Sequence, residues 1–259
     1  MTESARFIVC VPTYDERDNL PRMVDALAAV REQATASGEV LVIDDSSPDG
    51  TGALADELAA TRPWLHVLHR PAKQGLGRAY LDAFRWALAR DYDYVLEMDC
   101  DFSHDPAAVP SLLAPAQAGA DLVLGSRYCD GGRVENWGRV RRIISGAGCL
   151  YARVVLGVPV RDLTGGYKCF RRAVLETIEL DAVDAQGYQF QIEMTYRALL
   201  LGFKVQEVPI TFADRLVGGS KMSRSIVLEA IRRVPLLRLE AARGRLPRAD
   251  ARAGHHPKR

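Results

Sequence analysis

The chain has 259 residues, of which 48% are hydrophobic and 26% are charged, so it can bury a sizeable core and is not a low-complexity polymer. Lysine plus arginine number 34 and aspartate plus glutamate 33, a balance that gives no reason to expect binding to nucleic acid. The five cysteines include no C-x-x-C pair, which argues against a zinc site and against a disulfide framework.

The N-terminus lacks the layout of a signal peptide, and no apolar run approaches the roughly 18 residues of a membrane-spanning helix. The longest candidate run, 143–158, is interrupted by Arg153. Together with the unpaired cysteines, this predicts a cytoplasmic protein that lies at most on the surface of a membrane.

The first half of the chain alternates short apolar runs with amphipathic stretches. The apolar runs, which predict buried strands, cover 7–11, 40–43, 65–68, 94–98 and 122–124. Patterns with helical spacing cover 20–30, 76–88 and 107–118. This alternation predicts an α/β fold with a doubly wound, mostly parallel sheet flanked by helices.

The second half is less regular. Residues 140–156 have an apolar face that is either core or a membrane-surface contact, and 202–212 resembles a strand. Residues 223–239 are apolar and arginine-rich, and Pro235 should kink or end any helix there. We expect one domain over 1–222, followed by an amphipathic and basic extension over 223–259 that is partly disordered. The apolar face of 140–156 comprises Val140, Ile143, Ile144, Ala147, Leu150, Tyr151, Val154 and Val155.

Polar residues follow three of the predicted strands, at the sheet edge where ligands bind in such folds. Asp99 and Asp101 come directly after the run 94–98 and form a D-x-D motif that can approach Mg²⁺ or Mn²⁺. D-x-D alone is a common chance string, but acidic clusters also follow the first two strands.

After the first strand, Tyr14 offers an aromatic face to a base, and Glu16 can accept a hydrogen bond from a base or ribose. After the second, Asp45 can hold the same groups. The alternative is structural, because acidic residues also favour helix N-termini, and Asp49 or Thr51 can cap the next helix.

Basic residues that could bind phosphate groups lie near the same motifs or in the second half of the chain. Arg127 follows the fifth strand, while Arg215 and Lys221 flank Gly218 and Gly219 in a stretch that suits either a loop closing over a ligand or an ordinary turn. Other polar residues have both a structural and a functional interpretation. The turn at Thr164, Gly165 and Gly166 is either purely structural or lies beside the acceptor, and Gln189, Gln191 and Glu193, at a predicted helix start, can orient sugar hydroxyls or arginine side chains. His104 follows the D-x-D motif, and we expect it to be a loop contact.

The strings in this order resemble family 2 glycosyltransferases of the GT-A fold, and more closely the dolichol-phosphate and polyprenol-phosphate mannose synthase group. The resemblance spans the chain from Val11 to Ser223. It rests on PTYDERDNL, VIDDSSPDGT, QGLGRAY, EMDCDFSHDP, LGSRY, DLTGGYKCFRR, GYQFQIEM, EVPITFADR and GGSKMS.

The resemblance implies an inverting transfer of mannose from GDP-mannose to a polyprenyl monophosphate. It implies that Asp101 is the main metal ligand, that Arg127 meets phosphate, and that Arg215 and Lys221 close over the donor or receive the acceptor phosphate. It further implies a nucleoside site and a diphosphate site. These would be formed by Pro12, Tyr14, Glu16, Ile43 and Asp45, and by Asp99, Cys100 and Asp101, respectively.

Two departures concern the metal motif, where Cys100 replaces a frequent Ala and Ser103 replaces the Gln that some members use as a further ligand. Two other functions stay open: transfer of glucose or another sugar from a UDP or GDP donor, and a non-catalytic nucleotide-sugar-binding subunit. Because the acceptor is a lipid, we expect peripheral contact with the cytoplasmic face of a membrane, where a membrane-embedded partner protein is a further candidate.

Overall fold

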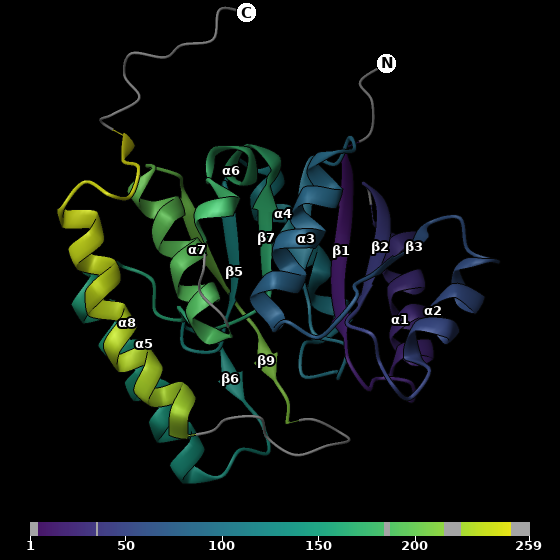
Figure 1. Ribbon diagram of the computed structural model, residues 1–259, viewed down its shortest axis with the longest axis horizontal. Helices are drawn as coiled ribbons and strands as arrows, with labels where there is room; N and C mark the ends of the chain where they lie inside the picture. Colours follow the sequence, from purple (N-terminus) through teal and green to yellow (C-terminus); the bar gives the residue numbers. More distant parts are fainter. Residues whose placement is uncertain (1–4, 35, 184–186, 215–223, 250–259) are drawn as a thin grey trace, which may run out of the picture.

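The computed structural model describes residues 5–34, 36–183, 187–214 and 224–249 (Figure 1). Its centre is a seven-stranded sheet in the order β3-β2-β1-β4-β7-β5-β8. β7 runs antiparallel to both of its neighbours, and every other pairing described in this sheet is parallel, as predicted. The strands are β1 (Arg6–Thr13), β2 (Ser37–Asp44), β3 (Leu65–His69), β4 (Tyr94–Glu97), β5 (Leu122–Ser126), β7 (Lys168–Arg171) and β8 (Val205–Pro209).

The single strand predicted over 202–212 is divided in two. β8 ends at Pro209, which has no backbone N–H to continue the ladder. The chain then forms β9 (Thr211–Phe212), which pairs with β6 (Arg133–Val134) in a separate two-stranded sheet.

The helices largely follow the predicted ranges. The segment expected over 107–118 begins as a short 3₁₀ helix, η1 (Pro106–Ala108), because Asp105 accepts a hydrogen bond from the backbone N–H of Ala107. The others are α1 (Leu20–Gln33), α2 (Thr51–Ala59), α3 (Leu76–Leu88), α4 (Val109–Gln117), α5 (Arg139–Leu156), α6 (Arg172–Thr177), a 3₁₀ turn η2 (Leu180–Ala182), α7 (Tyr188–Leu200) and α8 (Arg224–Ala242).

Alternation along the strands supplies a core to each face of the sheet. In β1, Phe7, Val9 and Val11 point toward the layer that contains α1 and α4, whereas Ile8 and Cys10 point toward the layer of α3, α6 and α7. Figure 1 shows these helices covering the two faces of the sheet. Polar groups therefore gather at the ends of the strands, which the helices do not cover.

α8 lies beside α5 at one end of the molecule and also contacts α7 (Figure 1). The Tyr151 hydroxyl donates to the carbonyl oxygen of Ile231 at 2.8 Å. The helix continues through Pro235 to Ala242, so of the two expected effects of Pro235, a kink or an end, the end does not occur. Burial of Val234 and Leu237, on either side of the proline, stabilises the helix against the lost hydrogen bond.

The apolar face predicted on 140–156 is mostly exposed. Val140, Ile143, Leu150 and Val154 have exposed fractions of 71%, 69%, 58% and 69%, so the core interpretation is wrong for these residues. α5 packs instead through its other side, by Cys149, Ala152 and Leu156. Within the described residues, no helix is long and apolar enough to span a bilayer.

Candidate active site

A cavity of about 280 Å³ opens at the carboxyl ends of β1, β2 and β4. Seven residues that were predicted for the nucleoside and diphosphate sites line it: Pro12, Tyr14, Glu16, Asp45, Asp99, Cys100 and Asp101. The other lining residues are Thr13, Lys73, Gly75, Leu76, Ala79, Thr164, Gly166, Gly187 and Gln191.

The two carboxylates of the D-x-D motif differ in exposure. Asp101 is 3% exposed, and its Oδ1 accepts hydrogen bonds from the backbone N–H and hydroxyl of Ser103 at 3.0 and 2.5 Å. The side chain of Asp99 is 28% exposed, and its backbone N–H donates to Nδ1 of His104 at 3.1 Å. Ser103 therefore orients Asp101, and His104 makes the loop contact expected of it.

The chemistry of these donors fits a divalent cation that is shared with a ligand. Asp99 and Asp101 supply oxygen atoms alone, which suits Mg²⁺ or Mn²⁺, whereas Ser103 is not among the residues that line the cavity. Among the described residues no group of three or more His, Cys, Asp or Glu side chains could hold a metal ion. The arrangement therefore suits a cation whose remaining ligands are phosphate oxygens and water, and not a closed structural metal site.

The part of the site formed after β1, β2 and β3 contains two basic residues, Arg70 and Lys73, that were not predicted from the sequence. Asp45 is 7% exposed and is paired with Arg70, whose Nε also donates to Asp82 at 2.8 Å. Burial raises the pKa of Asp45, and the Arg70 guanidinium opposes this shift. The ammonium of Lys73 lies 3.5 Å from the centre of the Tyr14 ring, on the aromatic face proposed for a base.

The loops at this edge contain backbone strain. Asp15, Ser46 and Phe102 have positive φ angles of 58°, 55° and 59°, and they follow β1, β2 and β4 respectively. Non-glycine residues rarely adopt this conformation, and such strain concentrates at functional sites. The hydroxyl of Ser46 donates to the carbonyl oxygen of Arg70 at 2.8 Å, which helps to hold one of these turns.

Two predicted residues are buried outside the cavity. Ile43 is fully buried in the core. Arg127 is 6% exposed, and its Nε and Nη2 each donate to Asp162 at 2.7 Å. Burial alone would raise the pKa of Asp162, but the charge and hydrogen bonds of Arg127 lower it.

Arg127 is therefore committed to a forked ion pair with a residue 35 positions later, which its own motif does not reveal. It reaches the cavity indirectly, because its Nη2 also donates to Thr164 at 2.8 Å and Thr164 lines the wall. Arg215 and Lys221 lie outside the described residues.

The comparison with known proteins agrees with this geometry. The family model described as "Glycosyl transferase family 2" matches residues 8–179. The chain belongs to glycosyltransferase family 2. Among curated members, the polyprenol monophosphomannose synthase of Mycolicibacterium smegmatis is 50% identical over 94% of this chain and 90% of its own length. The undecaprenyl-phosphate mannosyltransferase of Micrococcus luteus is 48% identical over 87% of this chain and 91% of its own length.

Solved structures share the α/β GT-A fold expected from the sequence. Glucosyl-3-phosphoglycerate synthase from Mycobacterium tuberculosis, in complex with Mn²⁺, UDP and phosphoglyceric acid, superposes with a TM-score of 0.62 at 21% identity, over 94% of this chain and 80% of that chain. At this identity the likeness concerns the fold.

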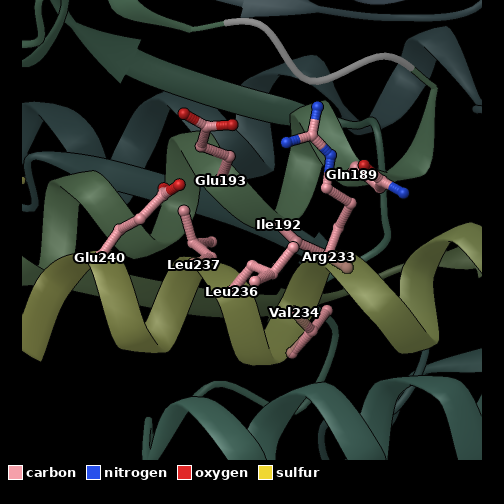
Figure 2. A pocket seen from close by; sticks show the side chains of 8 residues that line it. All are labelled: Gln189, Ile192, Glu193, Arg233, Val234, Leu236, Leu237 and Glu240. Carbon is pink, nitrogen blue, oxygen red and sulfur yellow. The ribbon is translucent and has the colours of Figure 1, made fainter.

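In this family 2 glycosyltransferase, some residues of the site lie outside the matched range 8–179. Gln191, in the second turn of α7, and Gly187, just before the helix, both line the cavity. Gln189 and Glu193 do not: they line a separate cavity of about 40 Å³ between α7 and α8 (Figure 2). Of the three polar residues noted on this helix, the structure therefore brings Gln191 to the site.

Proposed function

We propose that the protein transfers mannose from GDP-mannose to a polyprenyl monophosphate with inversion, giving a β-mannosyl phosphopolyprenol, and that it uses Mg²⁺ or Mn²⁺. The printed names of the two curated relatives support the sugar and the class of acceptor. The observation that carries the proposal is the position of Asp99 and Asp101 in one cavity with Tyr14, Glu16 and Asp45.

Each part of this cavity suits one part of a nucleotide sugar. Tyr14, Glu16 and Asp45 offer aromatic and acceptor groups to the nucleoside, and Asp99 and Asp101 would hold the cation at the diphosphate. A bound divalent cation supplies charge neutralisation for the departing nucleoside diphosphate. Ser103 keeps Asp101 in the orientation that this role requires.

The acceptor needs little activation, because a phosphate monoester is already anionic at neutral pH. Catalysis then depends on alignment and on electrostatic stabilisation of the leaving group. We propose that Arg127 contributes by fixing Thr164 at the cavity wall, since its guanidinium is occupied by Asp162. We retain the proposal that Arg215 and Lys221 receive the acceptor phosphate.

We further propose that the protein works on the cytoplasmic surface of an anionic membrane, with the exposed sides of α5 and α8 against it. Ile231, Leu236 and Leu239 of α8 are 49%, 48% and 41% exposed, and α8 packs beside the exposed apolar face of α5. Arg142 and Arg232 are exposed on the same two helices. Apolar side chains flanked by arginine suit an anionic interface, at about 1 kcal/mol per basic residue.

Vesicle sedimentation tests this surface. Binding to phosphatidylglycerol vesicles should weaken with salt and should be strongly reduced by Ile143→Glu combined with Val154→Glu. Ala53→Glu on exposed α2 adds the same type of charge away from this face and should leave binding intact. Equal binding by all three proteins would refute the proposed membrane contact.

The decisive test of the activity is transfer of radiolabelled mannose from GDP-mannose to a panel of polyprenyl phosphates, with and without a chelator. We expect a lipid product that disappears with chelator and returns with Mg²⁺ or Mn²⁺. Preference for UDP-glucose would favour the alternative sugar transfer. Tight nucleotide-sugar binding without any product would favour a non-catalytic subunit.

A further inference from the structure

Gln191 has an amide group that makes no hydrogen bond of normal geometry among the described residues, although it lies beside the buried carboxylate of Glu97. The residue is 2% exposed, and it lines the cavity. Buried polar groups are nearly always paired, so an orphaned amide at a cavity wall indicates a ligand that completes it.

The backbone beneath Gln191 is firmly held. The buried ammonium of Lys168, in β7, donates to the carbonyl oxygen of Gln191 at 2.7 Å and to the hydroxyl of Thr195 at 2.9 Å. Glu97, the last residue of β4, is fully buried, and its carboxylate lies beside the Lys168 ammonium and the Gln191 amide without a hydrogen bond of normal geometry. The hydrogen bonds of Lys168 connect the start of α7 to the centre of the sheet, so the amide projects from a rigid base.

The space in front of the amide is kept open by a glycine. A Cβ atom placed on Gly166 would lie 3.4 Å from Nε2 of Gln191. Gly166, Thr164 and Gln191 form the wall contributed by the second half of the chain, whereas the proposed nucleoside wall comes from the first half. Asp99 and Asp101 also line the cavity, at the proposed position of the diphosphate. In a nucleotide sugar the diphosphate joins the nucleoside to the sugar. If the nucleoside lies against the first-half residues and the diphosphate at Asp99 and Asp101, the sugar lies next to Gln191.

The chemistry of an amide distinguishes between the groups that could bind there. A phosphate accepts hydrogen bonds and would leave Oε1 unpaired, whereas sugar hydroxyls both donate and accept. A neutral amide also adds no charge to a wall beside two carboxylates. Neighbouring hydroxyls of one sugar ring can therefore pair with both ends of the Gln191 amide.

We propose that Gln191 binds hydroxyl groups of the donor's hexose and so determines which sugar is transferred, with Lys168 and Glu97 as positioning residues beneath it. This inference rests on the proposed function, in which the donor is a nucleotide sugar. It goes beyond that function by assigning sugar recognition to a residue of α7.

Calorimetric titration with GDP and with GDP-mannose, in the presence of Mg²⁺, separates sugar contacts from nucleotide contacts. Gln191→Leu should retain GDP affinity within about twofold, which also shows that it folds, and should bind GDP-mannose about tenfold more weakly, as expected for lost hydrogen bonds. Its preference for GDP-mannose over GDP-glucose should fall by a similar factor.

Gln189→Leu is the matched control. Gln189 is the same residue type on the same helix and is 6% exposed, but it lies in the small cavity beside Arg233 of α8 (Figure 2). This variant should keep the wild-type preference between sugars. Equal loss of GDP and GDP-mannose binding in Gln191→Leu, wild-type behaviour of that variant, or the same change in Gln189→Leu would each overturn the proposal.

The role of Lys168 is tested with Lys168→Met and the conservative Lys168→Arg. A positioning role predicts that Lys168→Met reproduces the loss of sugar preference at retained GDP affinity, and that Lys168→Arg partly restores it. Lower stability with an unchanged preference would assign Lys168 to the fold alone.

If the wild type uses UDP-glucose and not GDP-mannose, the proposed donor is wrong. The same proteins titrated with UDP and UDP-glucose would still decide the role of Gln191.

Discussion

The two edges of the central sheet differ in how their carboxylates are paired and in which residues form their turns. At the amino edge, Glu39 accepts hydrogen bonds from Arg6 and Tyr92 at 2.7 Å each and lies 2.6 Å from Nε2 of His66. The positive φ angles before β5 and β8 are taken by Gly119 and Gly202.

At the carboxyl edge, Glu97 is buried without a hydrogen bond of normal geometry, and burial raises its pKa to about 7. In the turns after β1, β2 and β4, the non-glycine residues Asp15, Ser46 and Phe102 have positive φ angles, as does Gly50 after β2. The amino edge is therefore arranged for stability. The carboxyl edge holds unpaired groups and strained turns that a ligand can use.

The largest expected effect is at the carboxyl edge. Asp101→Ala should lower mannosyl transfer by about 100-fold or more, because it removes charge from the proposed diphosphate site. Its free energy of unfolding should change by less than about 1 kcal/mol, since removing a buried carboxylate also removes its desolvation cost. Radiolabel transfer and urea unfolding measure the two quantities. Asp91→Ala, an exposed carboxylate at the amino edge, is the control and should be active.

The converse result is expected from Glu39→Ala. Removing the acceptor shared by Arg6, His66 and Tyr92 should lower the free energy of unfolding by about 1–3 kcal/mol, while activity per folded molecule stays unchanged. Urea unfolding at pH 7 combined with transfer assays checks this. A large loss of activity at wild-type stability would break the division between the edges.

The amino edge should also respond to acid. Burial opposes ionisation of Glu39, but hydrogen bonds from Tyr92, His66 and Arg6 lower its pKa below the ordinary value of 4.5. The unfolded carboxylate therefore takes up a proton before the folded one does. The stability it contributes is complete above pH 4.5 and decreases as pH falls through the folded pKa. The difference in unfolding free energy between wild type and Glu39→Gln should shrink below that pH. A constant difference down to pH 3 would contradict this.

The smallest effects concern the turns. A Cβ on Gly119 would meet no atom within 4 Å, so Gly119→Ala should cost about 1 kcal/mol through its φ of 101° alone and leave turnover unchanged. Asp15→Gly relieves strain but adds freedom to the unfolded chain, so its stability should change by less than about 0.5 kcal/mol. It should instead weaken nucleotide binding by a few-fold. A marked gain in stability with normal binding would show that the strain at Asp15 serves no ligand.

The first half of the chain could be predicted well because its signals are local. The apolar runs that became β1 to β5 and the acidic residues that follow them are adjacent in sequence, and a parallel sheet brings those ends together. Asp45, Asp99 and Asp101 therefore reach one cavity as expected.

Features that depend on distant partners could not be predicted. The pairing of Arg127 with Asp162 and the approach of Lys73 to Tyr14 join segments whose contact no local pattern encodes. The exposed face of α5 shows a related limit. Its apolar periodicity identified a helix, but periodicity alone does not reveal which side packs against the protein.

The antiparallel strand β7 has a consequence for the order in which the protein can assemble during synthesis. β4 and β5 do not pair with each other, because both pair with β7, whose residues are made later than those of either neighbour. A nascent chain that ends before Lys168 therefore has a gap in the middle of its sheet, with exposed strand edges on both sides. The same strand carries Lys168 to the carbonyl oxygen of Gln191. A chain truncated before Lys168 would therefore lack both the strand that completes the sheet and the hydrogen bond that supports the start of α7.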